Sequence, residues 1–357
     1  MNIEDKKIAI LSITQNGKSL GLNIKNNIKN ADLYFIKRDI VENETNVIHI
    51  NKRLKDFVPD IFNQYDYIIF IMATGIVIRT IAPLVVSKFS DPAILVIDEK
   101  GKNIISLLSG HMGGANEMTL YISDLINSNP VITTATDVNE KSSLDMIAKK
   151  LNAHIDNFRD NVLKINSMIV NNEKVGLFVD GNYLVDTRGF VLDEKNNLKD
   201  IDNIVVISNK VSIDTNLDFS NKNIIKVVPK DVVIGIGCRK DTDSEYMKES
   251  LVDFLEQQNI DINAIKEIGS IDVKKDEKAI LNLSKYLKVP FKIFTKEEIS
   301  QVDYLYDKSE WVKKSVGVYS VAEPVAHLLS NGNLLVKKHK YKGITFSIGR
   351  IDIWYML

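Results

Sequence analysis

Short apolar segments alternate with amphipathic segments from the start of this 357-residue chain, and this alternation constrains its fold more than any other feature. The apolar runs at 6–13, 65–73 and 92–98 have the length and composition of buried strands. Between 115 and 125, apolar residues instead recur every three or four positions, which is typical of one face of a helix. Buried strands that alternate with helices predict an open, largely parallel α/β sheet.

At about 150 residues per domain, a chain of this length is expected to hold two or three domains. We expect an N-terminal α/β domain over 1–150, followed by a smaller strand-rich module over 151–229, in which turns of Asn, Asp and Gly separate short apolar segments. A C-terminal α/β domain follows over 230–357, and Pro229 is a candidate hinge before it. The predicted fold is therefore two open parallel-sheet α/β domains joined by a smaller strand-rich middle module.

Charge and hydropathy exclude several classes of partner. The formal net charge is −1 and the pI is near 6.6, so no basic field attracts nucleic acid or an anionic membrane. The most apolar run, 67–78, is broken by Thr74 and Gly75 and is far shorter than the roughly 20 residues of a membrane-spanning helix. The first residues do not resemble a signal peptide, and the single cysteine, Cys238, excludes an intrachain disulfide. We expect a cytoplasmic protein that binds neither nucleic acid nor membrane.

The segment SGHMGGAN at 109–116 lies between a strand-like run and a helix. His111 stands just before the helix, where an imidazole can act as a general base or donate to an oxyanion. Gly113 and Gly114 let the backbone approach a ligand closely, and the first-turn amides of a helix are unsatisfied donors. The alternative is a polar loop histidine before an ordinary helix. Because open α/β sheets bind ligands at the carboxyl ends of their strands, the position favours a functional site.

Two further strand ends carry polar or cationic residues. In MATGIVIR, the amides of Thr74 and Gly75 can face an anion, and Arg79 lies about one helical turn further on. An ordinary turn with a surface arginine explains this spacing equally well. In VITTATD, Thr133 and Thr134 can bind polar substrate groups, although by themselves they more simply satisfy the start of a helix.

The run VVIGIGCRK has the strand–glycine–basic pattern of an anion site, which would use Arg239 and Lys240. It is not a dinucleotide fingerprint, because the third glycine is missing and no acidic residue ends a second strand about 20 residues further on. No phosphate-binding P-loop motif occurs in the chain. In SIDVKKDE, Lys274 and Lys275 are by themselves an ordinary solvated pair. Cys238 is more simply an inert small hydrophobic residue than a reactive thiol.

Together these motifs resemble those of one family, the CbiG proteins, which are the cobalt-precorrin-5A hydrolases of the anaerobic cobalamin pathway. The resemblance rests on MATGIVIRTIAPL, DPAILVIDEKGKNIISLLSGHMGGANE and PVITTATD in the first half, and on GIGCRK, SIDVKKDE and GVYSVAEPVAHLL in the second. The motifs run in the family's order from about residue 65 to the end, and the middle section is the family's variable part. Two positions depart from the pattern: Asp241 stands where the family often has a glycine-containing turn, and His327 stands where small apolar residues are usual.

This resemblance implies that water opens the δ-lactone of cobalt-precorrin-5A and that acetaldehyde leaves, which gives cobalt-precorrin-5B. Because the cobalt arrives within the cobalt-corrinoid substrate, we expect no metal or other cofactor held by the protein. His111 is then the candidate catalytic base or acid, Glu117 the candidate that orients it, and the amides from Gly113 to Asn116 the candidate oxyanion donors. The protein partners that we expect are a second copy in a homodimer or, transiently, the methyltransferases of the pathway.

The resemblance also implies several separated sites of cations and amides, because the substrate is broad and carries many carboxylates. The candidate substrate-binding residues are Thr74, Gly75, Arg79, Gly113, Gly114, Asn116, Thr133, Thr134, Arg239, Lys240, Lys274 and Lys275. Two alternatives stay open. One is a non-catalytic carrier or scaffold for the same tetrapyrroles. The other, suggested by the glycine turns, is a nucleotide-dependent oxidoreductase, which the missing fingerprint disfavours.

Overall fold

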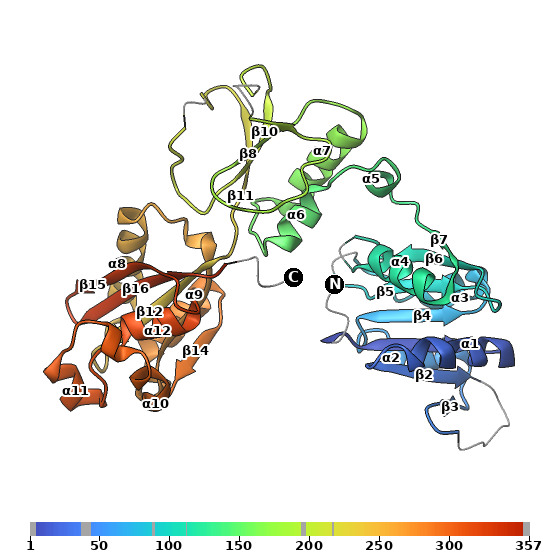
Figure 1. The fold of residues 1–357 in the computed structure, drawn as a ribbon, viewed down its shortest axis with the longest axis horizontal. Helices are drawn as coiled ribbons and strands as arrows, with labels where there is room; N and C mark the ends of the chain where they lie inside the picture. Colours follow the sequence, from blue (N-terminus) through green and yellow to red (C-terminus); the bar gives the residue numbers. More distant parts are fainter. Residues whose placement is uncertain are drawn as a thin grey trace. The chain divides into compact units, whose positions relative to one another are not determined.

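The structure, a computed structural model, describes residues 5–36, 44–87, 90–111, 113–193, 198–215 and 218–352. Its contacts divide the chain into two compact units, of which the first ends at Lys141 and the second begins at Ser142. The first unit is an α/β domain, and the second holds the middle module followed by another α/β domain (Figure 1). The predicted fold class is therefore confirmed.

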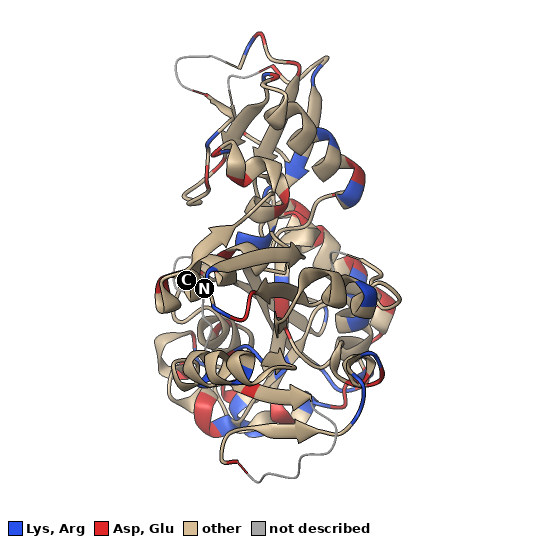
Figure 2. Cartoon of the chain, turned by 90° about the vertical axis from the view of Figure 1, so that its right-hand side faces the viewer, with Lys and Arg blue, Asp and Glu red and all other residues tan. Residues whose placement is uncertain are grey.

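The elements of both units carry acidic and basic residues in a mixed pattern, with Lys and Arg interspersed among Asp and Glu (Figure 2). No helix within the described ranges is long and apolar enough to cross a membrane.

The sheet of the first unit is built around strands that are buried along their whole length. Its strands lie in the order β3-β2-β1-β4-β5-β6-β7. Their bounds are β1 (Ile8–Ser12), β2 (Ala31–Ile36), β3 (Ile48–Ile50), β4 (Tyr67–Ile71), β5 (Ala93–Ile97), β6 (Asn103–Leu108) and β7 (Asn129–Val131). Strands β1, β4 and β5 are buried at every residue, as continuous aliphatic runs predict for strands that are covered on both faces.

Helices cover both faces of this sheet, because successive side chains of a strand point to opposite faces. They are α1 (Gln15–Asn26), α2 (Leu54–Ile61), α3 (Thr74–Ile81) and α4 (Ala115–Ile126). The short α5 (Ala135–Val138) follows β7 and belongs to neither core of the sheet. Ile8 and Ile10 of β1 lie in one core with apolar residues of α1 and α4. Ala9 and Leu11 lie in the other core, with apolar residues of α2 and α3.

Strand β6 reverses direction within the sheet. A short turn joins it to β5, in which Gly101, at a φ of +66°, donates its N–H to Asp98 O at 2.8 Å, and β5 and β6 therefore pair antiparallel. Strand β7 pairs parallel to β6. The carboxyl ends of β6 and β7 thus lie at the edge of the sheet formed by the amino ends of β4 and β5. Thr74 follows β4 at the opposite edge, which is formed by the carboxyl ends of β4 and β5. Strand β4 has five residues, which separates the two edges by about 17 Å.

The middle module is a small parallel sheet with helices α6 and α7 packed on it. Its strands lie in the order β11-β10-β8-β9, and all pair parallel. The elements are α6 (Leu144–Lys150), α7 (Phe158–Val170), β8 (Gly176–Val179), β9 (Val191–Leu192), β10 (Asn203–Ile207) and β11 (Asn223–Val227). Leu144 and Ile147 of α6 share a core with Val162 of α7 and Val205 of β10. The packing therefore places α6 in this module, whereas the sequence-based boundary at 150 assigned it to the N-terminal domain.

The C-terminal domain is a mixed sheet in the order β14-β13-β12-β16-β15. Its strands are β12 (Val232–Cys238), β13 (Ile265–Ile271), β14 (Phe291–Phe294), β15 (Leu334–Tyr341) and β16 (Ile344–Arg350). Its helices are α8 (Ser244–Gln257), α9 (Lys278–Leu287), α10 (Lys296–Ser300), α11 (Glu310–Val316) and α12 (Ala322–Leu329), with short 3₁₀ turns η2 (Ile262–Ala264), η3 (Asp272–Lys274) and η4 (Asp303–Leu305). The hairpin of β15 and β16 adds an antiparallel edge to the predicted parallel strands. Helices α8 and α9 share one core with β12, and α12 packs in the other.

The glycine at 235 in VVIGIGCRK packs against a helix of this domain. A Cβ at Gly235 would lie 2.0 Å from the carbonyl oxygen of Ala322 and 2.6 Å from the nitrogen of Ala326. Helix α12 can lie this close to β12 because residue 235 has no side chain. Helix packing thus explains this glycine, which weakens the case for a nucleotide-dependent oxidoreductase.

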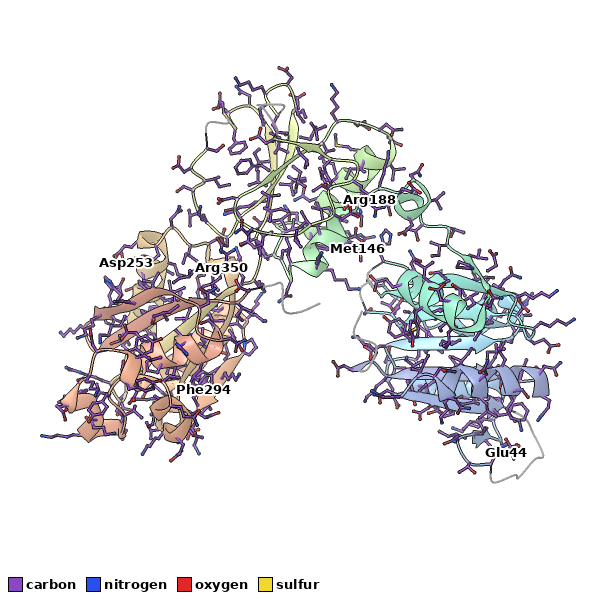
Figure 3. All side chains as sticks on the ribbon, viewed as in Figure 1. Glu44, Met146, Arg188, Asp253, Phe294 and Arg350 are labelled. Atoms are coloured by element: carbon purple, nitrogen blue, oxygen red, sulfur yellow. The ribbon has the colours of Figure 1, made fainter. Side chains whose placement is uncertain are left out.

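The middle module and the C-terminal domain are joined by a buried polar network. Asp231, which is fully buried, accepts hydrogen bonds from Arg350 Nε at 2.8 Å, Tyr183 OH at 2.9 Å and Asn209 Nδ2 at 3.0 Å. Arg350, labelled in Figure 3, ends the last strand, whereas Tyr183 and Asn209 belong to the module. Burial and the Asp231 carboxylate raise the pKa of Tyr183. This network and Pro229 lie within one compact unit, and a hinge at Pro229 stays a prediction.

Candidate active site

Residues 109–116 form a tight turn between β6 and α4, and the glycines of this turn are explained by its own packing. Ser109 is buried with a left-handed φ of +57°, and its hydroxyl donates to Asp91 O at 3.2 Å. A Cβ at Gly113 would lie 2.5 Å from the Cβ of Ser109, and Gly114 has a φ of +86°. A side chain is excluded at the first position and strained at the second. These glycines let the chain pack closely against itself, and their approach to a ligand stays a prediction.

The turn presents His111 to an aspartate from the neighbouring strand end. His111 Nε2 lies 2.5 Å from Asp137 Oδ2 and 3.1 Å from Thr136 Oγ1. The His111 side chain is only 15% exposed, against 42% for Asp137. Because an ionised carboxylate can only accept, Nε2 is the donor in this bond. This arrangement can take a proton and stabilise the resulting imidazolium.

Asn116 fixes the position of Asp137. Its side-chain nitrogen donates to Asp137 Oδ2 at 2.7 Å and to Thr134 Oγ1 at 3.0 Å, while its oxygen accepts from Ser106 Oγ at 2.6 Å. Both amide protons and the oxygen of this buried side chain are engaged within the protein, which is typical of a positioning residue, and the predicted contact of Asn116 with substrate stays a prediction. A Cβ at Gly110 would lie 2.8 Å from Asn116 Oδ1, so the close approach of the turn to this side chain requires glycine there.

Three of the four amides expected as open oxyanion donors, those of Gly114, Ala115 and Asn116, are engaged within the turn. Gly114 N donates to His111 O at 3.1 Å, Ala115 N to Ser109 O at 3.3 Å and Asn116 N to Gly110 O at 3.0 Å. These bonds close the turn and commit the donors to it.

Glu117, expected to orient His111, is exposed on the first turn of α4. The structure gives the orienting position to Asp137 instead. Asp137 and Thr136 both lie in the motif VITTATD, which gave no sign of this role, and Ser106 was missed. A polar serine inside an apolar strand was the available signal for Ser106, since such a hydroxyl needs a partner.

Thr74, Gly75 and Arg79 lie at the opposite edge of the sheet from His111. Thr74 and Gly75 open helix α3 after β4, and the exposed Arg79 donates from Nη1 to Gly75 O at 3.0 Å. The fold therefore does not bring them to the histidine. Beyond β7, Thr133 is exposed, whereas the hydroxyl of Thr134 accepts from Asn116.

In the C-terminal domain, Arg239 and Lys240 follow β12 and are exposed. Arg239 N donates to Gly343 O at 2.9 Å, which attaches this loop to the turn of the β15–β16 hairpin. Burial raises the pKa of the Cys238 thiol to about 11, which supports the interpretation of Cys238 as an inert residue.

The two lysines of SIDVKKDE lie in different environments. Lys275 is exposed, but Lys274 is buried, and its Nζ lies 3.2 Å from Glu277 Oε2. An ammonium paired with a buried carboxylate is not an exposed surface cation, so the structure does not support a substrate contact of Lys274, and that contact stays a prediction. The sequence offered no sign of this burial, because lysine pairs are usually solvated.

The described residues contain no group of three or more His, Cys, Asp and Glu side chains placed to hold a metal ion. That the protein holds no metal or cofactor of its own stays a prediction.

Comparisons with known proteins match the chain along most of its length. Family profiles match over 56–137 (Cobalamin synthesis G N-terminal), 142–215 (Cobalamin biosynthesis central region) and 232–349 (Cobalamin synthesis G C-terminus). A protein of Salmonella typhimurium strain LT2 named cobalt-precorrin-5A hydrolase is 43% identical over 294 residues, 81% of this chain and 83% of its own. A protein of the same name from Priestia megaterium is 28% identical over 358 residues, 96% of this chain and 94% of its own. The crystal structure of a cobalamin biosynthesis protein G homolog from Sulfolobus solfataricus, 24% identical, covers 99% of this chain and 100% of its own with a TM-score of 0.40.

Proposed function

Since the chain belongs to the CbiG family of cobalamin-synthesis proteins, we propose that it is a cobalt-precorrin-5A hydrolase, an enzyme of anaerobic cobalamin biosynthesis. Membership follows from the 43% identity to the Salmonella protein over 81% of this chain. The observation that carries the catalytic part of the proposal is the hydrogen-bonded pair of His111 and Asp137. Hydrolysis needs a group that takes a proton from water, and an imidazole held by a carboxylate can do so.

In the first proposed step, His111 takes a proton from water as the water oxygen attacks the lactone carbonyl carbon. The carboxylate of Asp137, 2.5 Å from Nε2, stabilises the imidazolium that forms. The tetrahedral intermediate then breaks the bond between the carbonyl carbon and the ring oxygen, and the imidazolium returns its proton to that oxygen. The products of this step are a carboxylic acid and a hydroxyl group.

The second proposed step releases acetaldehyde by a retro-aldol cleavage. His111 takes the proton of the new hydroxyl, and the carbon–oxygen double bond forms as the carbon–carbon bond to the macrocycle breaks. The electron pair of that bond stays with the macrocycle, which then takes up a proton. One histidine therefore serves both steps, and the macrocycle leaves as cobalt-precorrin-5B.

Exposed cations are the proposed binding sites for the carboxylates of the cobalt-corrinoid substrate. They are Arg79 on α3, Arg239 and Lys240 after β12, and Lys275 after η3. A guanidinium can bind a carboxylate through two parallel hydrogen bonds, which favours the two arginines. The exposed Thr133 and the helix start at Thr74 and Gly75 are additional polar contacts in this proposal.

We place the enzyme in the cytoplasm, without a resident metal or cofactor, because the cobalt arrives within the substrate. Its proposed protein partners are a second copy of the chain or, transiently, the methyltransferases that produce and consume corrinoid intermediates. A carrier or scaffold for the same tetrapyrroles would need no histidine–aspartate pair, so this alternative is not favoured.

The proposal is tested by acetaldehyde release from cobalt-precorrin-5A, measured per folded molecule. We expect His111→Ala to lower turnover about 100-fold or more, the usual scale of a general acid–base contribution, with little change in substrate affinity. Glu117→Gln, which changes an exposed carboxylate on the same turn, is the matched control and should stay within about threefold of the wild type. Wild-type turnover in His111→Ala would remove the histidine from the mechanism, and absence of acetaldehyde from the wild type would favour a carrier.

A further inference from the structure

A buried glutamate holds the loop that carries Arg239. Glu277 stands at the N-cap position of α9, and its side chain is 7% exposed. Its Oε1 accepts the backbone N–H of Thr242 at 3.1 Å, and its Oε2 lies 3.2 Å from Nζ of Lys274, whose side chain is 11% exposed. The carboxylate thus bridges a backbone amide and a buried ammonium.

The backbone that this bridge holds is strained. Asp241, directly before Thr242, has a left-handed φ of +55°, which costs free energy for any residue other than glycine. Thr242 Oγ1 donates to Arg239 O at 2.9 Å, so the position of Thr242 also constrains the backbone at Arg239. If the bond to Glu277 were lost, Asp241 could relax to a negative φ, and the start of the loop would still be anchored by the bond from Arg239 N to Gly343 O.

We propose that Glu277 is a positioning residue for substrate binding, because it tethers Thr242 and thereby fixes the loop that presents Arg239 and Lys240. Lys274 serves this tether as its counter-ion, since an unpaired carboxylate is costly in a buried site. The inference rests on the proposed function, in which Arg239 and Lys240 bind carboxylates of the substrate.

Two double variants distinguish the effect of the hydrogen bond to Thr242 from the effect of the two buried charges. Lys274→Met with Glu277→Gln removes both buried charges but keeps an oxygen that can accept from Thr242. Lys274→Met with Glu277→Leu removes the charges and the acceptor. Replacing a buried ion pair by uncharged side chains of similar volume is often tolerated, so both variants should fold, which circular dichroism checks.

We expect the Leu double variant to raise KM for cobalt-precorrin-5A about 10-fold with little change in kcat, on the scale of one hydrogen bond to a charged group. The conservative Gln double variant should restore KM to within about threefold of the wild type. Adding Asp241→Gly to the Leu double variant should recover part of the loss, because glycine adopts the left-handed conformation without a tether. Arg239→Ala gives the reference value of KM for a lost cation.

Hydrogen exchange at the Thr242 amide is a second measurement, and it does not depend on the substrate. The amide should exchange faster in the Leu double variant than in the Gln double variant. Equal KM in the two variants, whether unchanged or raised alike, together with equal exchange would overturn the inference. A wild type that does not act on cobalt-precorrin-5A would refute the proposed function, while the exchange measurement would still decide the tether.

Discussion

Replacing Asp137 by asparagine tests the electrostatic half of the histidine–aspartate pair. Asp137 Oδ2 accepts from His111 Nε2 at 2.5 Å and from Asn116 Nδ2 at 2.7 Å. An asparagine oxygen in the same place can accept both bonds, so Asp137→Asn keeps the geometry and removes the charge. What is lost is the stabilisation of the imidazolium that forms during proton transfer.

The size of this loss follows from the exposure of the two side chains. Two unit charges 4 Å apart interact by about 4 kcal/mol at an effective dielectric constant of 20 and by about 1 kcal/mol in water. With His111 15% exposed and Asp137 42% exposed, the pair lies between these limits, at about 2–3 kcal/mol. At about 1.4 kcal/mol per factor of ten, turnover should fall about 30- to 150-fold.

The assay is the rate of acetaldehyde release under saturating substrate, with the melting temperature measured on the same preparations. We expect kcat to fall while KM and the melting temperature change little. Asp124→Asn, an equivalent change at an exposed residue of α4, should leave kcat within about twofold. Unchanged turnover in Asp137→Asn would refute the argument that this carboxylate stabilises a charged His111.

Two further predictions concern stability and thiol chemistry in the second unit. Asp231→Ala should lower the free energy of unfolding, measured in urea, by about 3–5 kcal/mol, because Arg350 and Tyr183 lose a buried acceptor. The control Asp186→Ala removes an exposed pair with Arg188 and should cost less than about 1 kcal/mol. A loss as small as that in Asp231→Ala would contradict the prediction. Because burial raises the pKa of Cys238 to about 11, iodoacetamide should label the native protein near pH 8 much more slowly than the urea-unfolded chain, and equal rates would contradict the raised pKa. The stability contributed by the neutral thiol is complete below pH 9.0 and falls as the pH rises toward about 11.

The strands and helices of the first unit were predictable because their signals are local. Continuous aliphatic runs predict buried strands such as β4 and β5, and the apolar recurrence between 115 and 125 predicts the buried face of α4, where Met118 and Ile122 are fully buried. The residues at 98–101, DEKG, also have the composition of a turn. A tight turn joins antiparallel neighbours, so this turn also predicts that the strands on either side of it run antiparallel. The expectation of a largely parallel sheet did not take this into account.

Strand direction decided which motifs share a site. The sequence placed MATGIVIR and SGHMGGAN alike at the carboxyl ends of strands, and both do follow strands. Because β6 runs against β4, the two motifs end at opposite edges of one sheet. The order of the segments along the chain does not show which motifs lie at the same end of the sheet, whereas the antiparallel pairing of β5 with β6 does.

The sequence by itself determined the fold class, the candidate histidine and the resemblance to a family, because composition, periodicity and motifs are properties of neighbouring residues. Only the tertiary structure decided that Asp137, and not Glu117, holds His111, that Asn116 holds Asp137, and that Lys274 is buried against Glu277. His111 and Asp137 are 26 residues apart, and only the parallel pairing of β6 with β7 brings their strand ends together. Hydrogen bonds act over about 3 Å in space, whatever the separation along the chain, so the partner of a polar side chain is fixed by packing.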